Sequence, residues 1–135
     1  NSRQSIFEEM RMAALMAKAS SGDASVLGAE ETLLMGTARG GEALGLPIGR
    51  IAADYAADLV VVDLRALSLQ PGKTASKQVV YSMQPDAIKR VIVGGETVAE
   101  DGHLTRVDEK EIVAKVREVT AGWERVSRDA FARHP

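Results

Sequence analysis

The chain has 135 residues, which at roughly 100 to 200 residues per domain corresponds to one domain or to part of a larger one. This length excludes a complete (β/α)₈ barrel, which needs about 200 residues or more. Hydrophobic residues make up 45% and charged residues 27%, so the composition predicts a globular chain and excludes a disordered one. A net charge of -2 lacks the basic excess of nucleic-acid-binding surfaces, so nucleic acid is excluded as a partner.

The chain contains no cysteine, which excludes disulfides, thiolate nucleophiles and cysteine-ligated zinc sites. No apolar run approaches the ~18 residues of a membrane span, and the start of the sequence lacks the order of a signal peptide. We therefore expect a soluble, cytoplasmic protein without a membrane partner. The sequence begins at Asn1 rather than Met, with a helix signal a few residues later, so we expect a piece of a longer polypeptide.

Two helical stretches are predicted in the first third of the chain. The first covers about residues 6–19, after a Ser-x-x-Glu capping box that starts at Ser5. Its surface is largely apolar, so this helix needs neighbours on most sides. The second covers about residues 29–44, with an interruption at Gly40-Gly41 and a C-terminal stop at Gly45.

A β-rich unit is predicted over about residues 49–104, where β-branched residues replace alanine and methionine. Residues 59–62 form a short continuous apolar run typical of a buried strand, and residues 79–81 form a second apolar triplet. Residues 88–100 contain two extended runs around Gly94-Gly95. This pattern predicts a β-hairpin, because glycine adopts the positive φ that tight hairpin turns require.

A last helix is predicted over about residues 109–131, with Asp108 as its N-cap. Its apolar residues recur in steps of four and three: Ile112, Val116, Val119, Trp123, Val126 and Ala130. Such a stripe is typical of a coiled-coil seam or, over so few heptads, of a helix packed on its own domain, which is the interpretation we favour. Two stabilising i,i+4 pairs are expected, Glu111 with Lys115 and Glu124 with Arg128.

No catalytic motif emerges from the residues alone. His103 follows a turn and His134 is the penultimate residue, so neither belongs to a metal-ligand spacing and both are expected on a solvated surface. The glycines that superficially suggest a phosphate loop follow no strand and lack its Gly-Lys-Ser/Thr ending, so they are expected to end helices: Gly36, Gly40, Gly41 and Gly45. Three aspartates around the first strand are expected at boundaries and turns: Asp54, Asp58 and Asp63.

Residues 49–63 resemble the Gly-x-Ile/Leu-x-x-Gly-x-x-Ala-Asp-Leu-Val-Val-x-Asp signature of the metal-dependent amidohydrolase superfamily. In that family the signature marks the passage from a catalytic barrel to a small β-sandwich domain. Further stretches resemble the family's closing barrel helices and its tail, in the order found among cytosine and guanine deaminases and triazine chlorohydrolases: 8–11, 29–37, 41–45, 79–82, 91–98 and 101–104. Asp54 stands where the family usually has glycine, and aspartate tolerates a left-handed turn.

The resemblance implies an α+β fragment in three parts. Residues 1–47 would be the last helices of the (β/α)₈ barrel, residues 48–107 the C-terminal part of the composite β-sandwich domain, and residues 108–135 a C-terminal helix. The family's metal ligands would all lie upstream of Asn1. Asn1 and Ser2 resemble a pair that follows the last ligand near the substrate pocket, so the resemblance implies that they bind substrate.

The resemblance also implies a C-terminal segment of a hydrolase that acts on C–N or C–Cl bonds of nucleobase-like or triazine-like substrates. This chain would contain no catalytic residue and no cofactor, and would be silent alone, whereas a full-length relative would hold zinc or iron. The alternative is an independent, non-catalytic module that self-associates or binds a partner. The expected partner is a second copy, most simply in a symmetric dimer, or the missing N-terminal part, because strand edges and apolar faces would otherwise stay open.

Overall fold

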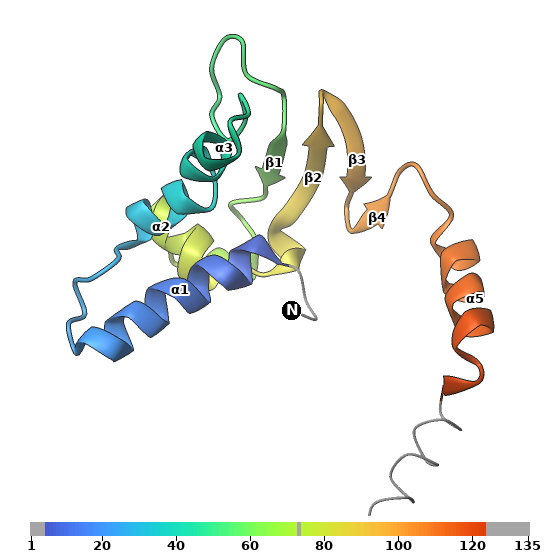
Figure 1. The fold of residues 1–135 in the computed structure, drawn as a ribbon, viewed down its shortest axis with the longest axis horizontal. Helices are drawn as coiled ribbons and strands as arrows, with labels where there is room; N and C mark the ends of the chain where they lie inside the picture. Colours follow the sequence, from blue (N-terminus) through green and yellow to red (C-terminus); the bar gives the residue numbers. More distant parts are fainter. Residues whose placement is uncertain (1–4, 73, 124–135) are drawn as a thin grey trace, which may run out of the picture.

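The computed structural model describes residues 5–72 and 74–123 as a mixture of helices and one antiparallel sheet (Figure 1). The elements in chain order are α1 (Ile6–Ser21), α2 (Ala29–Met35), α3 (Ala38–Leu44), β1 (Leu59–Val62), η1 (Leu67–Leu69), α4 (Ala75–Lys77), η2 (Gln78–Ser82), η3 (Pro85–Ala87), β2 (Ile88–Val93), β3 (Glu96–Glu100), β4 (His103–Leu104) and α5 (Glu109–Thr120). This confirms the mixed helix and sheet character. The assignment of residues 1–47, 48–107 and 108–135 to parts of a barrel and a sandwich stays a prediction.

Helix α1 begins after Ser5 and ends at Gly22, which adopts the left-handed conformation with φ of 68°. Ser5 occupies the N-cap position with extended backbone, but its side chain makes no capping hydrogen bond, so the hydroxyl half of the predicted capping box is wrong. The first turn carries Glu8 and Glu9, whose negative charge favours the positive end of the helix dipole. The helix therefore starts where the sequence indicated, for a different physical reason.

The predicted helix over residues 29–44 is two helices, α2 and α3, and the break lies at Gly36 rather than at Gly40-Gly41. A Cβ on Gly36 would lie 2.4 Å from Sδ of Met10, so this glycine lets α1 pack closely against the end of α2. Gly40 and Gly41 lie inside α3, where a Cβ on Gly41 would lie 2.4 Å from the carbonyl oxygen of Ile48. Gly45, with φ of 67°, is confirmed as the stop of α3.

The four strands form an antiparallel meander in the order β1-β2-β3-β4. The predicted hairpin is confirmed: Val93 pairs with Glu96, and Gly94-Gly95 have φ of 57° and 83°. A second tight turn at Asp101-Gly102, also with two positive φ angles, brings the short strand β4 back beside β3.

Strand β1 is confirmed as a strand, but its predicted burial is wrong. It lies at the edge of the sheet, with β2 as its only strand partner in the described chain. Val60 and Val61 are each 45% exposed. The burial typical of a continuous apolar run is absent because no described helix covers either face of β1 completely.

A helical insertion, residues 67–87, separates β1 from β2 and contributes four of the eight buried hydrophobic residues of the described chain: Leu69, Val80, Met83 and Ala87. Residues 79–81, expected inside a β-rich unit, lie in η2, and Val80 in that turn is fully buried. Figure 1 shows the insertion beside α1 and α2, and its buried side chains pack with theirs. Periodicity cannot distinguish a short buried strand from a buried helical turn, which explains the wrong prediction. The buried side chains form two clusters: Ala14, Ala29 and Val80, and Leu69, Met83 and Ala87.

Helix α5 lies apart from the rest of the described chain (Figure 1). Its predicted cap is confirmed, since the Asp108 carboxylate accepts hydrogen bonds from the backbone N–H groups of Lys110 and Glu111. Lys115 pairs with Glu118 at 3.3 Å rather than with Glu111, and the pair Glu124 with Arg128 lies outside the described residues. None of the residues of α5 is buried, so the expected packing on its own domain is wrong for the described part.

Among residues 5–72 and 74–123, no helix is both long enough and apolar enough to cross a membrane.

Candidate functional site

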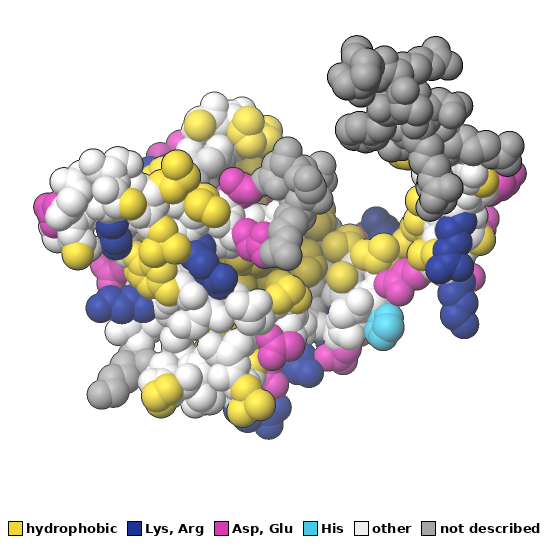
Figure 2. Space-filling view, turned by 90° about the horizontal axis from the view of Figure 1, so that it is seen from below, with side chains coloured by type: hydrophobic (Ala, Val, Ile, Leu, Met, Phe, Trp, Pro, Cys, Tyr) yellow, Lys and Arg dark blue, Asp and Glu magenta, His cyan; other side chains and the backbone are white. Residues whose placement is uncertain are grey.

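An open apolar groove of about 410 Å³ lies between α1, the end of α2 and strand β1. Its wall consists mainly of aliphatic and aromatic side chains, with three polar residues among them: Ile6, Phe7, Met10, Leu33, Gly36, Thr37, Gly49, Arg50, Ile51, Asp58, Leu59, Val60, Val62 and Val79. Figure 2 shows hydrophobic side chains gathered in the middle of one face, between the helical part and the sheet. We call this hollow the groove.

Close backbone approaches shape the groove. Gly49 has φ of 81°, and a Cβ at this position would lie 2.4 Å from the carbonyl oxygen of Thr37. The loop after α3 therefore lies directly against the turn between α2 and α3, and it carries Ile51 to the rim, where this side chain is 92% exposed. An almost fully exposed isoleucine beside an apolar groove is typical of a surface that another chain segment covers.

The polar groups of the groove hold its walls together. Nη2 of Arg50 lies 2.5 Å from Oε1 of Glu42, and this hydrogen bond raises the pKa of Arg50 above its usual value. Oδ1 of Asp58 accepts a 2.7 Å hydrogen bond from the backbone N–H of Gly94, which ties the start of β1 to the hairpin. These two polar groups are thus already engaged in structural bonds within the chain.

The predicted boundary and turn roles of the aspartates are confirmed. Asp54 has φ of 66°, so it adopts the left-handed turn expected where the family usually has glycine. Asp63 follows β1 and accepts hydrogen bonds from the backbone N–H of Arg65 at 2.9 Å and from its Nε at 3.1 Å. The Arg65 side chain, and then its backbone N–H, lower the pKa of Asp63 below its usual value.

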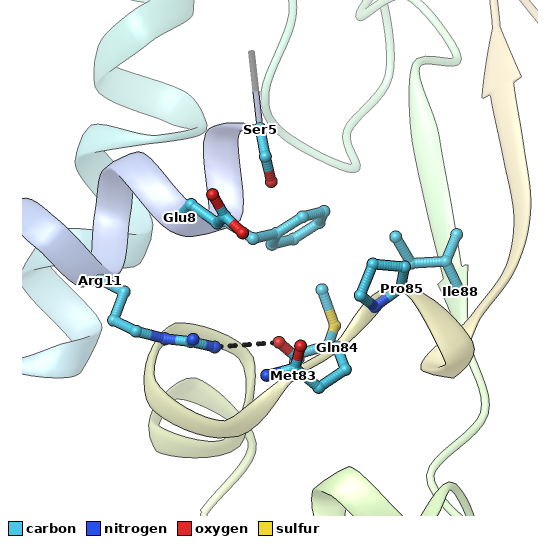
Figure 3. Close-up of a pocket in the computed structure, with 8 residues that line it drawn as sticks. Ser5, Glu8, Arg11, Met83, Gln84, Pro85 and Ile88 are labelled. Atoms are coloured by element: carbon cyan, nitrogen blue, oxygen red, sulfur yellow. Dashed lines mark hydrogen bonds between the residues drawn. The ribbon is translucent and has the colours of Figure 1, made fainter. Parts of the chain in front are cut away.

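A smaller hollow of about 50 Å³ lies at the start of α1, beside Phe7, Arg11, Met83 and Pro85. Figure 3 shows the Arg11 guanidinium pointing at the Met83 carbonyl, to which its Nη2 donates a 3.0 Å hydrogen bond. Its Nε donates to the Val80 carbonyl at 3.4 Å. A cation placed on the last carbonyls of a helical turn satisfies acceptors that have no partner within the turn. This hollow has a structural role, and its volume suits one or two water molecules.

The residues expected to bind substrate, Asn1 and Ser2, lie outside the described residues, as does His134. His103 lies on β4 with a side chain that is 79% exposed, 3.5 Å from Oε2 of Glu109, as expected of a surface histidine. Across residues 5–72 and 74–123, no group of three or more His, Cys, Asp or Glu side chains could hold a metal ion. The groove, with its mainly apolar wall, can bury apolar surface.

Neither the groove nor the role of Arg11 was predicted from the sequence. The groove combines α1 with β1, about fifty residues apart in the sequence, and no local pattern indicates that they meet. The one feature of the sequence that pointed toward the groove was the largely apolar surface of α1, which predicted that this helix needs neighbours on most sides.

Comparison with known proteins decides the family. The sequence profile of the Amidohydrolase family matches residues 1–98, which is more than half of the chain. The chain belongs to the amidohydrolase family. The chain is 38% identical over 120 residues to the 5-methylthioadenosine/S-adenosylhomocysteine deaminase of Pyrococcus abyssi, and the match covers 89% of this chain.

Two solved structures of this family share the fold. An adenosine deaminase from Xanthomonas campestris with bound zinc is 37% identical, with a TM-score of 0.78 over 83% of this chain. A zinc complex of the atrazine chlorohydrolase of Arthrobacter aurescens is 25% identical, with a TM-score of 0.73 over 81% of this chain. These relatives confirm the resemblance to metal-dependent deaminases and triazine chlorohydrolases.

The amidohydrolase chain described here spans about a quarter of the length of these relatives: 28% of the Pyrococcus protein and 26% of the Xanthomonas structure. The family profile ends within β3, at residue 98. A 120-residue match within 135 residues necessarily includes α5, so the likeness to the Pyrococcus deaminase extends beyond the family profile into this helix.

Proposed function

We propose that this chain is the C-terminal part of a hydrolytic deaminase that acts on the exocyclic amino group of an adenine nucleoside. The observation that carries the proposal is sequence identity. The chain is 38% identical to the 5-methylthioadenosine/S-adenosylhomocysteine deaminase and 37% identical to the adenosine deaminase, whereas it is 25% identical to the atrazine chlorohydrolase. From the sequence alone, we expected cleavage of C–N or C–Cl bonds in nucleobase-like or triazine-like substrates. The present proposal is the more specific one, cleavage of the exocyclic C–N bond of adenine. A cytoplasmic location is part of the proposal, supported by a sequence without cysteine.

In the proposed reaction, water replaces the amino group of the adenine ring: the C6–O bond forms, the C6–N bond breaks, and the nitrogen leaves as ammonia. The described residues do not fit a resident metal, since they offer no ligand cluster. Zinc or iron, which would supply an activated water, would therefore be held by the remaining part of the polypeptide. We call that part, roughly three quarters of the relatives' length, the N-terminal part.

The proposed contribution of this chain is structural support for the site, together with Asn1 and Ser2 at the substrate pocket. The two faces of β1 support this role. Leu59, Val60 and Val62 line the apolar groove, whereas Val61 lies among charged residues of β2, β3 and the turn after β3: Lys89, Arg90, Glu100 and Asp101. One face of this edge strand thus suits water and the other suits burial against the N-terminal part.

The proposal is tested with the full-length protein and with the 135-residue chain. We expect the full-length protein to convert 5-methylthioadenosine or adenosine to the corresponding inosine compound, followed by the ultraviolet spectrum and by ammonia release. Cytosine, guanine and atrazine serve as comparison substrates. We expect the 135-residue chain, supplied with zinc or iron, to show no turnover above background. Faster dechlorination of atrazine than deamination of adenosine, or chelator-sensitive turnover by the short chain, would contradict the proposal.

The independent, self-associating module remains the second candidate, and the open groove favours self-association of the isolated chain in either case. The two candidates differ in what the short chain does alone. A strictly monomeric chain with cooperative thermal unfolding would show that the fragment closes its own core, and would support the independent module. Concentration-dependent association, relieved by the N-terminal part, would support the C-terminal part of an enzyme.

A further inference from the structure

Helix α5 presents a continuous apolar stripe that no other described element covers. Four side chains of α5 at helical spacing are 45–63% exposed, Ile112, Val113, Val116 and Val119, and Trp123, three residues past the end of the helix, is 67% exposed. The opposite face carries Lys110, Glu111, Arg117 and Glu118, and every residue from 110 to 119 is exposed. A helix with such a stripe is typical of a surface element that packs on an apolar neighbour.

The connection to β4 limits how this helix can rotate. Oε1 of Glu109 accepts a 2.7 Å hydrogen bond from the backbone N–H of Leu104, and its Oε2 lies 3.5 Å from Nδ1 of His103. On a helical wheel, Glu109 lies on the same side as Val116, at the start of the stripe. The hydrogen bond between Glu109 and Leu104 therefore keeps the stripe on the side of α5 that carries Glu109, next to β4.

We propose that the stripe of α5 docks on the N-terminal part of the same polypeptide and clamps the end of the sheet to it. This inference rests on the proposed function, because it requires that part to exist. It goes beyond the family profile, which ends before α5, and it concerns a helix that the Pyrococcus deaminase shares.

The size of the stripe favours this partner over a second copy of the chain. The four exposed side chains of α5, even with Trp123, offer less area than the about 800 Å² per partner that a stable interface between separate chains buries. A covalently connected surface needs less area, because the connection keeps its effective concentration in the millimolar range. The stripe is thus large enough for docking within one polypeptide and small for a dimer that forms through α5 alone.

Hydrogen exchange of the full-length protein tests the docking without relying on activity. We expect the amides of α5 to exchange at least about tenfold more slowly in the full-length protein than in the 135-residue chain. The double variant Val116→Glu with Val119→Glu should abolish this difference and leave the β2–β3 hairpin protected. Ala114→Glu places one new glutamate on the opposite face of the helix and serves as the control, which should retain the protection.

Three outcomes would overturn the proposal. The first is rapid exchange of α5 in the full-length protein, and the second is slow exchange that the double variant leaves unchanged. The third is a dimer of the 135-residue chain that the double variant dissociates and Ala114→Glu does not, because the stripe would then bind a second copy. Absence of deaminase activity alone would contradict the proposed function and leave the docking result intact.

Discussion

The guanidinium of Arg11 donates a 3.0 Å hydrogen bond to the carbonyl oxygen of Met83, a residue 72 positions further along the chain. The same side chain reaches the Val80 carbonyl, so one arginine of α1 binds two carbonyls, one in the middle of η2 and one just after its end. Through this contact the first helix holds the insertion that precedes β2.

Replacing Arg11 by methionine should lower the free energy of unfolding by about 1–3 kcal/mol, because two part-buried carbonyls lose a charged donor. Arg11→Lys keeps the charge but can reach only one of the two carbonyls well, so its loss should be smaller. Urea unfolding followed by far-ultraviolet circular dichroism measures both. Equal stability of the methionine variant and the wild type would show that water replaces the guanidinium at no cost.

The two neighbouring glycines of α3 should respond to alanine with opposite signs. Gly41→Ala should destabilise the chain, since the new methyl would lie 2.4 Å from the Ile48 carbonyl oxygen and force the loop away. Gly40→Ala meets its nearest atom at 3.5 Å, an ordinary contact, so the gain in helix propensity of up to about 1 kcal/mol should show. Thermal unfolding of the two variants provides the comparison. The same sign for both would mean that the close approach at Gly41 does not persist in solution.

Charged substitutions at the two adjacent valines of β1 should have different effects, because Val60 lines the groove and Val61 lies on the charged face of the sheet. Val60→Lys should weaken self-association of the 135-residue chain at least about tenfold, because it places a charge in the groove at a cost of more than about 1.4 kcal/mol. Val61→Lys, at a position with the same exposure and strand, should change the association far less, because its neighbours are already charged. Sedimentation equilibrium over a wide concentration range decides between them. Weakening by Val61→Lys alone would place the contact on the other face.

Acid should loosen the connection between β4 and α5. The backbone N–H of Leu104, and then His103, lower the pKa of Glu109 below its usual value. A carboxylate with a lowered folded pKa stabilises the structure above its unfolded pKa of about 4.3, and this contribution is lost as the pH falls through the folded value. Glu109→Gln should therefore remove part of the acid sensitivity. Amide shifts of Leu104 followed by NMR between pH ~6 and pH ~2.5 test this, and an unchanged titration in the variant would count against it.

Local turn chemistry was predictable from the sequence. Gly94-Gly95 and Asp54 take positive φ angles because few other residues do so at low cost, and this preference needs no knowledge of distant contacts. The N-cap at Asp108 is local in the same way. Such features depend on a few consecutive residues, so a single sequence indicates them well.

Features that depend on distant neighbours were not predictable. The helical turn at Val80 is fixed by burial against α1 and α2, and its apolar residues alone suit a strand equally well. Gly36 and Gly41 resemble helix breakers, yet their importance lies in the atoms of Met10 and Ile48 that approach them. The groove belongs to the same class, because its walls come from separate parts of the chain.

The meander order of the sheet has a consequence for the sequence of folding events. The turns at Gly94-Gly95 and Asp101-Gly102 join neighbouring strands through two residues each, so β2, β3 and β4 can pair quickly through local contacts. Strand β1 can pair with β2 only when the whole connection between them, residues 63–87 with the insertion, has closed as a loop. Closing this long loop costs more chain entropy than closing a two-residue turn. That insertion contributes half of the buried hydrophobic side chains, so attachment of the edge strand and consolidation of the helices should occur in one kinetic step. Strand β1, which forms one wall of the groove, is then the last strand to pair. The groove therefore exists only in chains that have finished folding.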